Sequence, residues 1–174
     1  MTIISISGVG GSGKTVVAKL LARGLKFKLV HLNELAKKKK LYIGYDKKRK
    51  SWIVSISKLK KEVKELSKKY PNLIIESLYA HEFPADVVII LRCRPDILEK
   101  RLKKKYSWPT KIIENKEAEM IGLITEEALD FHNKKNVFEI DTTKKAVGQT
   151  VKAVKEILSG RKEKYKAGRI DWLK

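Results

Sequence analysis

GVGGSGKT, at residues 8–15, follows the apolar run IISIS of residues 3–7 and precedes a stretch whose apolar residues recur at helical spacing. It fits the pattern G-x-x-x-x-G-K-[ST], in which a glycine-rich loop between a strand and a helix cradles phosphate groups. Glycines let the backbone bend so that successive N–H groups converge on phosphate oxygens, and the helix N-terminus points at the same place. The stretch predicts a strand, a phosphate loop and a helix that ends at Gly24.

Short apolar runs alternate with helical patterns along the rest of the chain. Further strands are predicted at residues 28–31, 73–76, 87–91 and 137–140. Helices are predicted around residues 34–37, capped by Asn33, and 59–70, 95–102, 121–131 and 147–158, with a loose tail at 159–174. Such alternation implies an α/β fold with a five-stranded parallel sheet covered by helices on both faces, and ligands then bind beyond the carboxyl ends of the strands.

Length and composition favour one globular domain. The chain has 174 residues, and 43% of them are hydrophobic, which argues against disorder. Its single cysteine, Cys93, excludes an intramolecular disulfide and suits a reducing compartment. No apolar run approaches the roughly 18 residues of a membrane span. We therefore expect a cytoplasmic protein with no membrane partner.

The net charge is unusually positive. The chain has 40 Lys and Arg residues and 20 Asp and Glu residues, which gives a formal net charge of +20 at pH 7. A site for one or two nucleotides needs only a few cations, so the surplus indicates RNA or an acidic partner. The alternative is the lysine-rich surface of a heat-adapted protein, although glutamate is not enriched to match.

Two basic segments interrupt the alternation. Residues 37–50 hold eight basic residues and one acid, with Tyr42 and Tyr45 among them. Residues 103–111 form a second basic segment, KKKYSWPTK, between two predicted helices. The first segment could close over a second anionic substrate, and the second could cover a phosphate and exclude water. The alternatives are a solvated charged face and a basic helix end.

With the phosphate loop and five strands, the two segments make the chain resemble a nucleoside monophosphate kinase. The resemblance sharpens at LYIGYD (residues 41–46), IESLYAH (75–81) and RIDWL (169–173). Together they resemble the adenylate kinase isoenzyme 6 family, in its archaeal form, over nearly the whole chain. The resemblance implies a single three-layer P-loop kinase domain over residues 1–174. Within it, residues of about 32–56 would form the monophosphate-binding insertion and about 103–112 a short lid.

The same resemblance implies an activity. The family transfers the γ-phosphoryl group of ATP, with Mg²⁺, to AMP or another nucleoside monophosphate. It also has ATPase activity and a role in maturing the small ribosomal subunit, with a ribosomal protein and rRNA as partners. Two alternatives stay open: an assembly ATPase or switch with little kinase activity, and a kinase of the same fold that acts on a small molecule other than a nucleotide.

Site residues follow from the motif and the resemblance. The residues that match the family's ATP loop are Gly11, Ser12, Gly13, Lys14, Thr15 and Val16. Lys14 is expected to bridge the terminal phosphates and Thr15 to ligate magnesium. Glu76 matches the acid of the Walker B strand, where it would act in catalysis and order water around the metal. Lys105 falls in the lid and Lys144 near the nucleotide base.

The monophosphate site is expected to draw on Lys37, with Arg92 and Arg94 as forked donors after the fourth strand. The alternative for these two arginines is capping or surface pairing. Lys37 and Lys105 stand where the family usually has arginine, so phosphates lose a bidentate partner and we predict a slow enzyme.

The Walker B region also departs from the family pattern. Leu78 replaces its usual histidine and cannot exchange a proton or orient a water, which predicts weak hydrolysis. His81, three residues later, is either a substitute or a structural residue.

Overall fold

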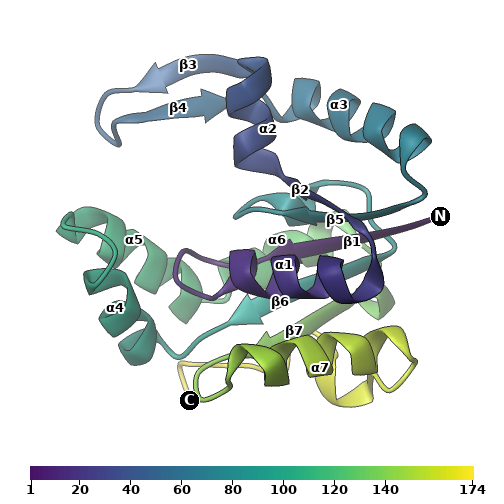
Figure 1. Ribbon diagram of the computed structural model, residues 1–174. Coiled ribbons are helices and arrows are strands. Elements are labelled where there is room, and N and C mark those ends of the chain that lie inside the picture. The colour runs from purple at the N-terminus through teal and green to yellow at the C-terminus, as the bar shows by residue number, and fades with distance from the viewer.

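The computed structural model describes residues 1–174 and is built around a sheet of five parallel strands. These strands are β1 (Thr2–Ser7), β2 (Lys28–His31), β5 (Asn72–Glu76), β6 (Val87–Arg92) and β7 (Val137–Asp141). They lie in the order β2-β5-β1-β6-β7, which places the phosphate-loop strand β1 at the centre (Figure 1). The predicted five-stranded parallel sheet is confirmed.

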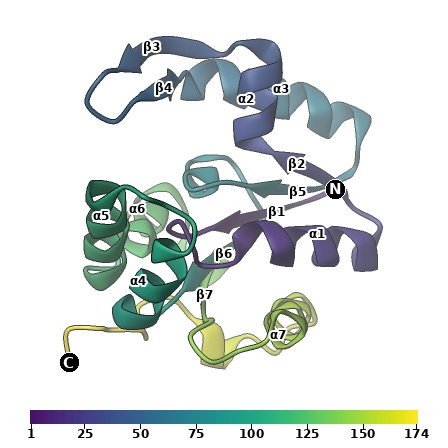
Figure 2. The same ribbon diagram turned by 60° about the vertical axis from the view of Figure 1, so that its left-hand side comes forward.

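Helices cover both faces of the sheet, which explains why its strands are almost wholly apolar. On one face, α1 (Lys14–Leu25) and α7 (Val147–Leu158) share a core cluster with alternate residues of the strands. On the other face, α4 (Pro95–Lys103), α5 (Pro109–Met120) and α6 (Leu123–Phe131) pack against β6 and β7. Beside them, α2 (Leu32–Lys39) and α3 (Ile56–Lys69) pack against β2 and β5. This is the predicted three-layer P-loop fold (Figures 1 and 2). None of its helices is long and apolar enough to span a membrane.

A hairpin begins in the first basic segment and extends a few residues beyond it. β3 (Tyr42–Asp46) and β4 (Ser51–Val54) pair antiparallel and project from the top of α2 toward α5 (Figures 1 and 2). The Tyr42 and Trp52 rings stack with centroids 5.2 Å apart. We expected a basic insertion at residues 32–56 but no strands in it. In the structure this segment comprises α2, the hairpin and the start of α3.

Two predicted helix boundaries are wrong. α1 does not end at Gly24: it continues to Leu25, which packs on the core, and its C-cap is Lys26 at φ 57°. Asn33 does not cap α2, because the N-cap is His31 and Asn33 lies inside the helix. The Asn33 Oδ1 atom instead accepts a hydrogen bond of 2.5 Å from the Tyr79 hydroxyl.

Two further segments are more ordered than predicted. The second basic segment leads from the end of α4 directly into α5, a helix that the sequence analysis missed. The predicted loose tail, residues 159–174, is anchored to the sheet. It includes a short 3-10 turn, η3 (Glu163–Tyr165), and backbone N–H groups of Gly168 and Arg169 that donate to the buried Glu139 carboxylate at 2.8 and 3.1 Å.

Candidate active site

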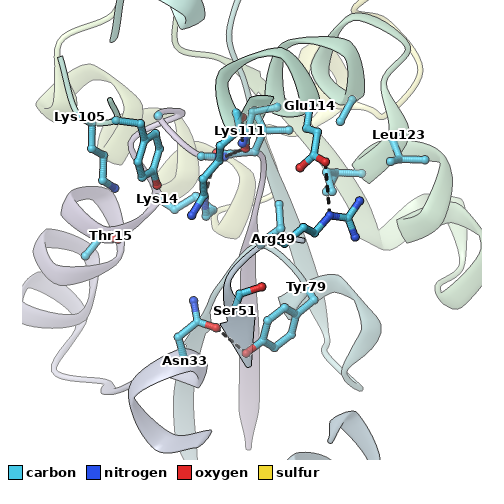
Figure 3. A pocket seen from close by; sticks show the side chains of 18 of the residues that line it. Lys14, Thr15, Asn33, Arg49, Ser51, Tyr79, Lys105, Lys111, Glu114 and Leu123 are labelled. Carbon is cyan, nitrogen blue, oxygen red and sulfur yellow. Dashed lines mark hydrogen bonds and ion pairs between the residues drawn. The ribbon is translucent and has the colours of Figure 1, made fainter. Parts of the chain in front are cut away.

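One large cavity of about 1030 Å³ opens at the carboxyl ends of the central strands. The phosphate loop forms one side of it, and the tip of the β3–β4 hairpin, the residues after β5 and helix α5 form the others (Figure 3). This volume is at the upper end of the range for small-molecule sites, about 300 to 1,000 Å³, and leaves room for two phosphorylated ligands.

The phosphate loop has the backbone that its glycines predict. Gly13 takes φ 95° as the N-cap of α1, a conformation that favours glycine. At Gly8 an added Cβ would lie 2.4 Å from the Leu91 carbonyl oxygen, so the loop can pack against β6 only without a side chain there. Gly11, Gly13, Lys14, Thr15 and Val16 line the cavity as expected, and Ser12 is buried beneath them.

Lys14 begins α1 and its ammonium group donates a 2.9 Å hydrogen bond to the Val9 carbonyl. Burial lowers the pKa of Lys14 to about 8, Glu76 opposes that shift, and the nearby Lys105 adds to it. Two cations, Lys14 and Lys105, thus lie close together at the phosphate-loop end of the cavity, with the Glu76 carboxylate beside them. Such an arrangement stabilises an incoming polyanion, because its charge relieves the repulsion between the lysines.

Glu76 ends β5 beside the phosphate loop, and its side chain is buried. Its carboxylate accepts a 3.4 Å hydrogen bond from the Thr15 hydroxyl and lies 2.8 Å from Nδ1 of His31, which ends the neighbouring strand β2. The sequence analysis missed His31. The only sign of this contact in the sequence was that His31 and Glu76 both end strands. The sequence does not show that these two strands are neighbours in the sheet.

The residues around Thr15 fit a magnesium ion that is held mainly by phosphates and water. Magnesium in nucleotide sites takes one or two protein ligands, usually oxygen atoms, and completes its shell with phosphate and water oxygens. The Thr15 hydroxyl and the Glu76 carboxylate supply such oxygens at the phosphate loop. No group of three or more His, Cys, Asp or Glu side chains is arranged to hold a metal by itself.

Leu78 and His81 follow Glu76 and both line the cavity. His81 is buried, with Nδ1 3.1 Å from the Ser7 hydroxyl and Nε2 3.1 Å from the Glu127 carboxylate. Burial lowers the pKa of His81, against the opposing effect of Glu127. The ring therefore pairs with Ser7 and Glu127, while His31 is the histidine on Glu76.

Cations reach the cavity from both basic segments. Lys105 and Lys111 come from the second basic segment, and Lys48 and Arg49 come from the tip of the hairpin. Figure 3 shows Lys14, Lys105 and Lys111 around the phosphate-loop end and Arg49 reaching toward Glu114 of α5. The Arg49 Nε atom lies 3.3 Å from the Glu114 carboxylate, so the hairpin and α5 meet over the cavity.

Besides the buried Ser12, four predicted site residues do not line the cavity. Lys37 is exposed on α2, and Lys144 is exposed after β7. Arg94 is exposed and pairs with Asp96 through contacts of 2.6 and 2.8 Å. Arg92 is only 2% exposed.

Arg92 is committed to an internal network. Its guanidinium donates to the carboxylates of Glu119 and Glu139, to the Thr125 hydroxyl and to the Glu119 carbonyl. Burial raises the pKa of Glu119, against the opposing effect of Arg92. In this network the Arg92 guanidinium has no free N–H pair for a substrate, and its pairing is internal rather than the capping or surface pairing that the sequence suggested. Arg94 does pair at the surface, with Asp96.

Comparison with known proteins agrees with this architecture. The AAA domain family matches residues 4–122. A solved shikimate kinase from Acinetobacter baumannii superposes with a TM-score of 0.62 at 16% identity, over 94% of this chain and 96% of that one. At such low identity the likeness concerns the fold alone.

Archaeal relatives extend over nearly the whole chain. A protein of Methanosarcina acetivorans named "Putative adenylate kinase" is 39% identical over 98% of this chain and 97% of its own length. Proteins of the same name from Methanocaldococcus jannaschii and Pyrococcus furiosus are 34% and 39% identical, over 97% and 99% of this chain and 92% of each relative. The chain therefore belongs to the adenylate kinase-like family of P-loop proteins that these archaeal relatives represent.

Proposed function

We propose that this protein is a nucleoside monophosphate kinase that transfers the γ-phosphoryl group of ATP to AMP. The observation that carries the proposal is the single cavity that joins the phosphate loop to the cationic tip of the hairpin, Lys48 and Arg49. One end suits the phosphates of ATP, and the other suits the phosphate of a second nucleotide. The names of the archaeal relatives support the same reaction.

Phosphoryl transfer of this kind needs positioning and charge neutralisation rather than a covalent intermediate. Lys14 bridges the terminal phosphates, and Lys105 covers them from the lid. Thr15 and Glu76 would hold magnesium, which would neutralise part of the phosphate charge when bound. Lys48 and Arg49 take the place that the sequence suggested for Lys37. Because Lys105 is not an arginine, one bidentate contact is lost and the enzyme is expected to be slow.

A second role is part of the proposal. The protein would act in maturation of the small ribosomal subunit, with a ribosomal protein and rRNA as partners, and hydrolyse ATP there. The net charge of +20 supports a polyanionic partner, and so does the exposed pair of Trp52 and Tyr45 on the hairpin, 59% and 47% accessible. An assembly ATPase with little kinase activity is therefore the second candidate. A cytoplasmic location stays a prediction.

Product analysis tests these alternatives. Purified protein is given labelled ATP and magnesium alone, with each nucleoside monophosphate, and with ribosomal subunit extract. We expect ADP in proportion to added AMP, and Lys14→Met should lower that rate by about three orders of magnitude by removing charge from the transferred phosphate. Lys19→Met, at an exposed position of the same helix, is the matched control and should transfer normally. Free phosphate that forms only with the extract would refute the kinase and favour the assembly ATPase.

A further inference from the structure

Helix α5 begins within the proposed lid, residues of about 103–112, and is called the lid helix below. It is hydrogen-bonded to the phosphate loop through Asn115. The Asn115 Oδ1 atom accepts the backbone N–H of Gly10 at 2.8 Å, and its Nδ2 atom donates to the Lys111 carbonyl at 2.7 Å. Asn115 lines the cavity, and an added Cβ on Gly10 would lie 2.9 Å from Oδ1. One side chain of α5 thus fixes both the loop and the first turns of its own helix.

The same helix makes contacts on either side of Asn115. Glu114 meets Arg49 of the hairpin tip at 3.3 Å. At the other end of α5, Glu119 accepts from Arg92 at 2.7 Å and from the Trp172 indole at 2.8 Å. Helix α5 is thus anchored in the protein core at one end and contacts the hairpin near its middle. Asn115 joins this helix to the phosphate loop.

The chemistry of the amide suits this position. Phosphate loops bind anions through backbone N–H groups. A backbone N–H group without an acceptor destabilises the protein where water is excluded. A carboxylate would satisfy the Gly10 N–H but would repel the phosphates nearby. The neutral amide oxygen of Asn115 accepts the hydrogen bond without adding negative charge.

We propose that Asn115 is a positioning residue that couples the lid helix to the phosphate loop, so that Lys105 and Lys111 are held over the transferred phosphate. The inference rests on the proposed kinase function. It predicts that loss of the Asn115 amide lowers kcat and leaves nucleotide binding nearly unchanged, because binding needs the loop whereas transfer needs the lid in place.

A double-mutant cycle with Gly10 tests the coupling. Asn115→Ala should lower kcat about tenfold, the worth of one hydrogen bond, with KM for ATP and AMP within about threefold. Gly10→Ala should also lower kcat about tenfold, because the new methyl group displaces the end of the Asn115 side chain and breaks the same hydrogen bond. In the double variant no second contact is lost, so its kcat should stay within about threefold of that of Asn115→Ala rather than fall about 100-fold.

Folding failure does not explain such a pattern. Alanine favours a helix more than asparagine does, so Asn115→Ala should leave α5 intact. Glu117→Ala, at an exposed position of α5 outside the cavity, is the matched control and should keep the wild-type kcat. A wild-type kcat in Asn115→Ala, an effect confined to the ATP KM, or additive losses in the double variant would each overturn the proposal.

Hydrogen exchange gives a readout that is independent of kinase activity. In the nucleotide-free protein, Asn115→Ala should speed exchange in the peptide that contains Gly10 about tenfold, because that N–H loses its acceptor. Unchanged exchange would overturn the coupling. If wild-type protein made no ADP from AMP, the proposed function would fail, and this measurement would still decide whether Asn115 joins the lid helix to the loop.

Discussion

The ammonium group of Lys14 lies in a desolvated loop beside a second lysine, and this sets a pH limit on the proposed reaction. The pKa of Lys14 in the free protein is lowered to about 8, chiefly by burial. Bound phosphates favour the charged form and raise that pKa. Protonated Lys14 therefore predominates below pH 8, and above pH 8 ATP must bind together with a proton.

We expect kcat/KM for ATP to be level below about pH 8 and to fall up to tenfold per pH unit above it, because this ratio reports the free enzyme. A series of initial rates from pH 6.5 to 9.5 measures it. Lys105→Ala removes a cation that lowers the pKa of Lys14, so the fall should begin at higher pH in that variant. A profile that stays level to pH 9.5 in wild-type protein would contradict this account of Lys14.

At the scale of single elements, helix α1 offers a direct test of where it ends. Gly24 lies inside α1 at an exposed position. Its backbone is not in the left-handed region, so alanine can adopt the same conformation. Glycine inside a helix costs about 0.5 to 1 kcal/mol relative to alanine, so Gly24→Ala should raise the free energy of unfolding by that amount. An added Cβ would meet only the flexible end of Lys155, at 3.3 Å.

Urea denaturation of both proteins measures the difference. Gly122→Ala is the matched control, because Gly122 is the N-cap of α6 at φ 68° and alanine should destabilise there. A destabilised Gly24→Ala would mean that α1 ends at Gly24, as the sequence pattern first suggested.

Elements with a strong local pattern were predictable. The strands of the sheet are buried apolar runs, and the phosphate loop carries its own motif, so both followed from the sequence. The hairpin did not, because a bulge between Tyr42 and Gly44 breaks the alternation of its first strand and a run of charges forms its turn. Helix α5 was missed because it buries only Ile112 and Glu119, which is too narrow a face to give helical periodicity.

The site divides in the same way. Lys14, Thr15 and Glu76 were placed by motif and by the ends of adjacent strands. The role of Arg92 could not be predicted, because it depends on residues that are distant in the sequence. Arg92 pairs with Glu119 and Glu139, which lie 27 and 47 positions away and reach it only in the folded chain. Asn115 and His31 belong to no motif that the sequence analysis used, so only tertiary contacts identify them.

At the scale of the whole molecule, the buried ion network joins the sheet, the lid helix and the C-terminal segment. Arg92 and Glu139 come from β6 and β7, Glu119 from the end of α5, and Trp172 from the C-terminal segment. Because Glu119 lies in the last turn of α5, the segment that holds Trp172 also contacts the end of that helix. Stability and lid position should therefore change together when this segment is removed.

Deletion of residues 168–174 tests that link. It removes the Gly168, Arg169 and Ile170 N–H groups from the Glu139 carboxylate and the Trp172 indole from Glu119. Buried carboxylates that lose donors should lower the free energy of unfolding by about 2 to 4 kcal/mol, measured in urea, and kcat should fall as well. Deletion of residues 173–174 alone removes only exposed groups and should change neither quantity. Equal effects of the two deletions, or a longer deletion that lowers stability with kcat unchanged, would show that the C-terminal segment does not support the lid.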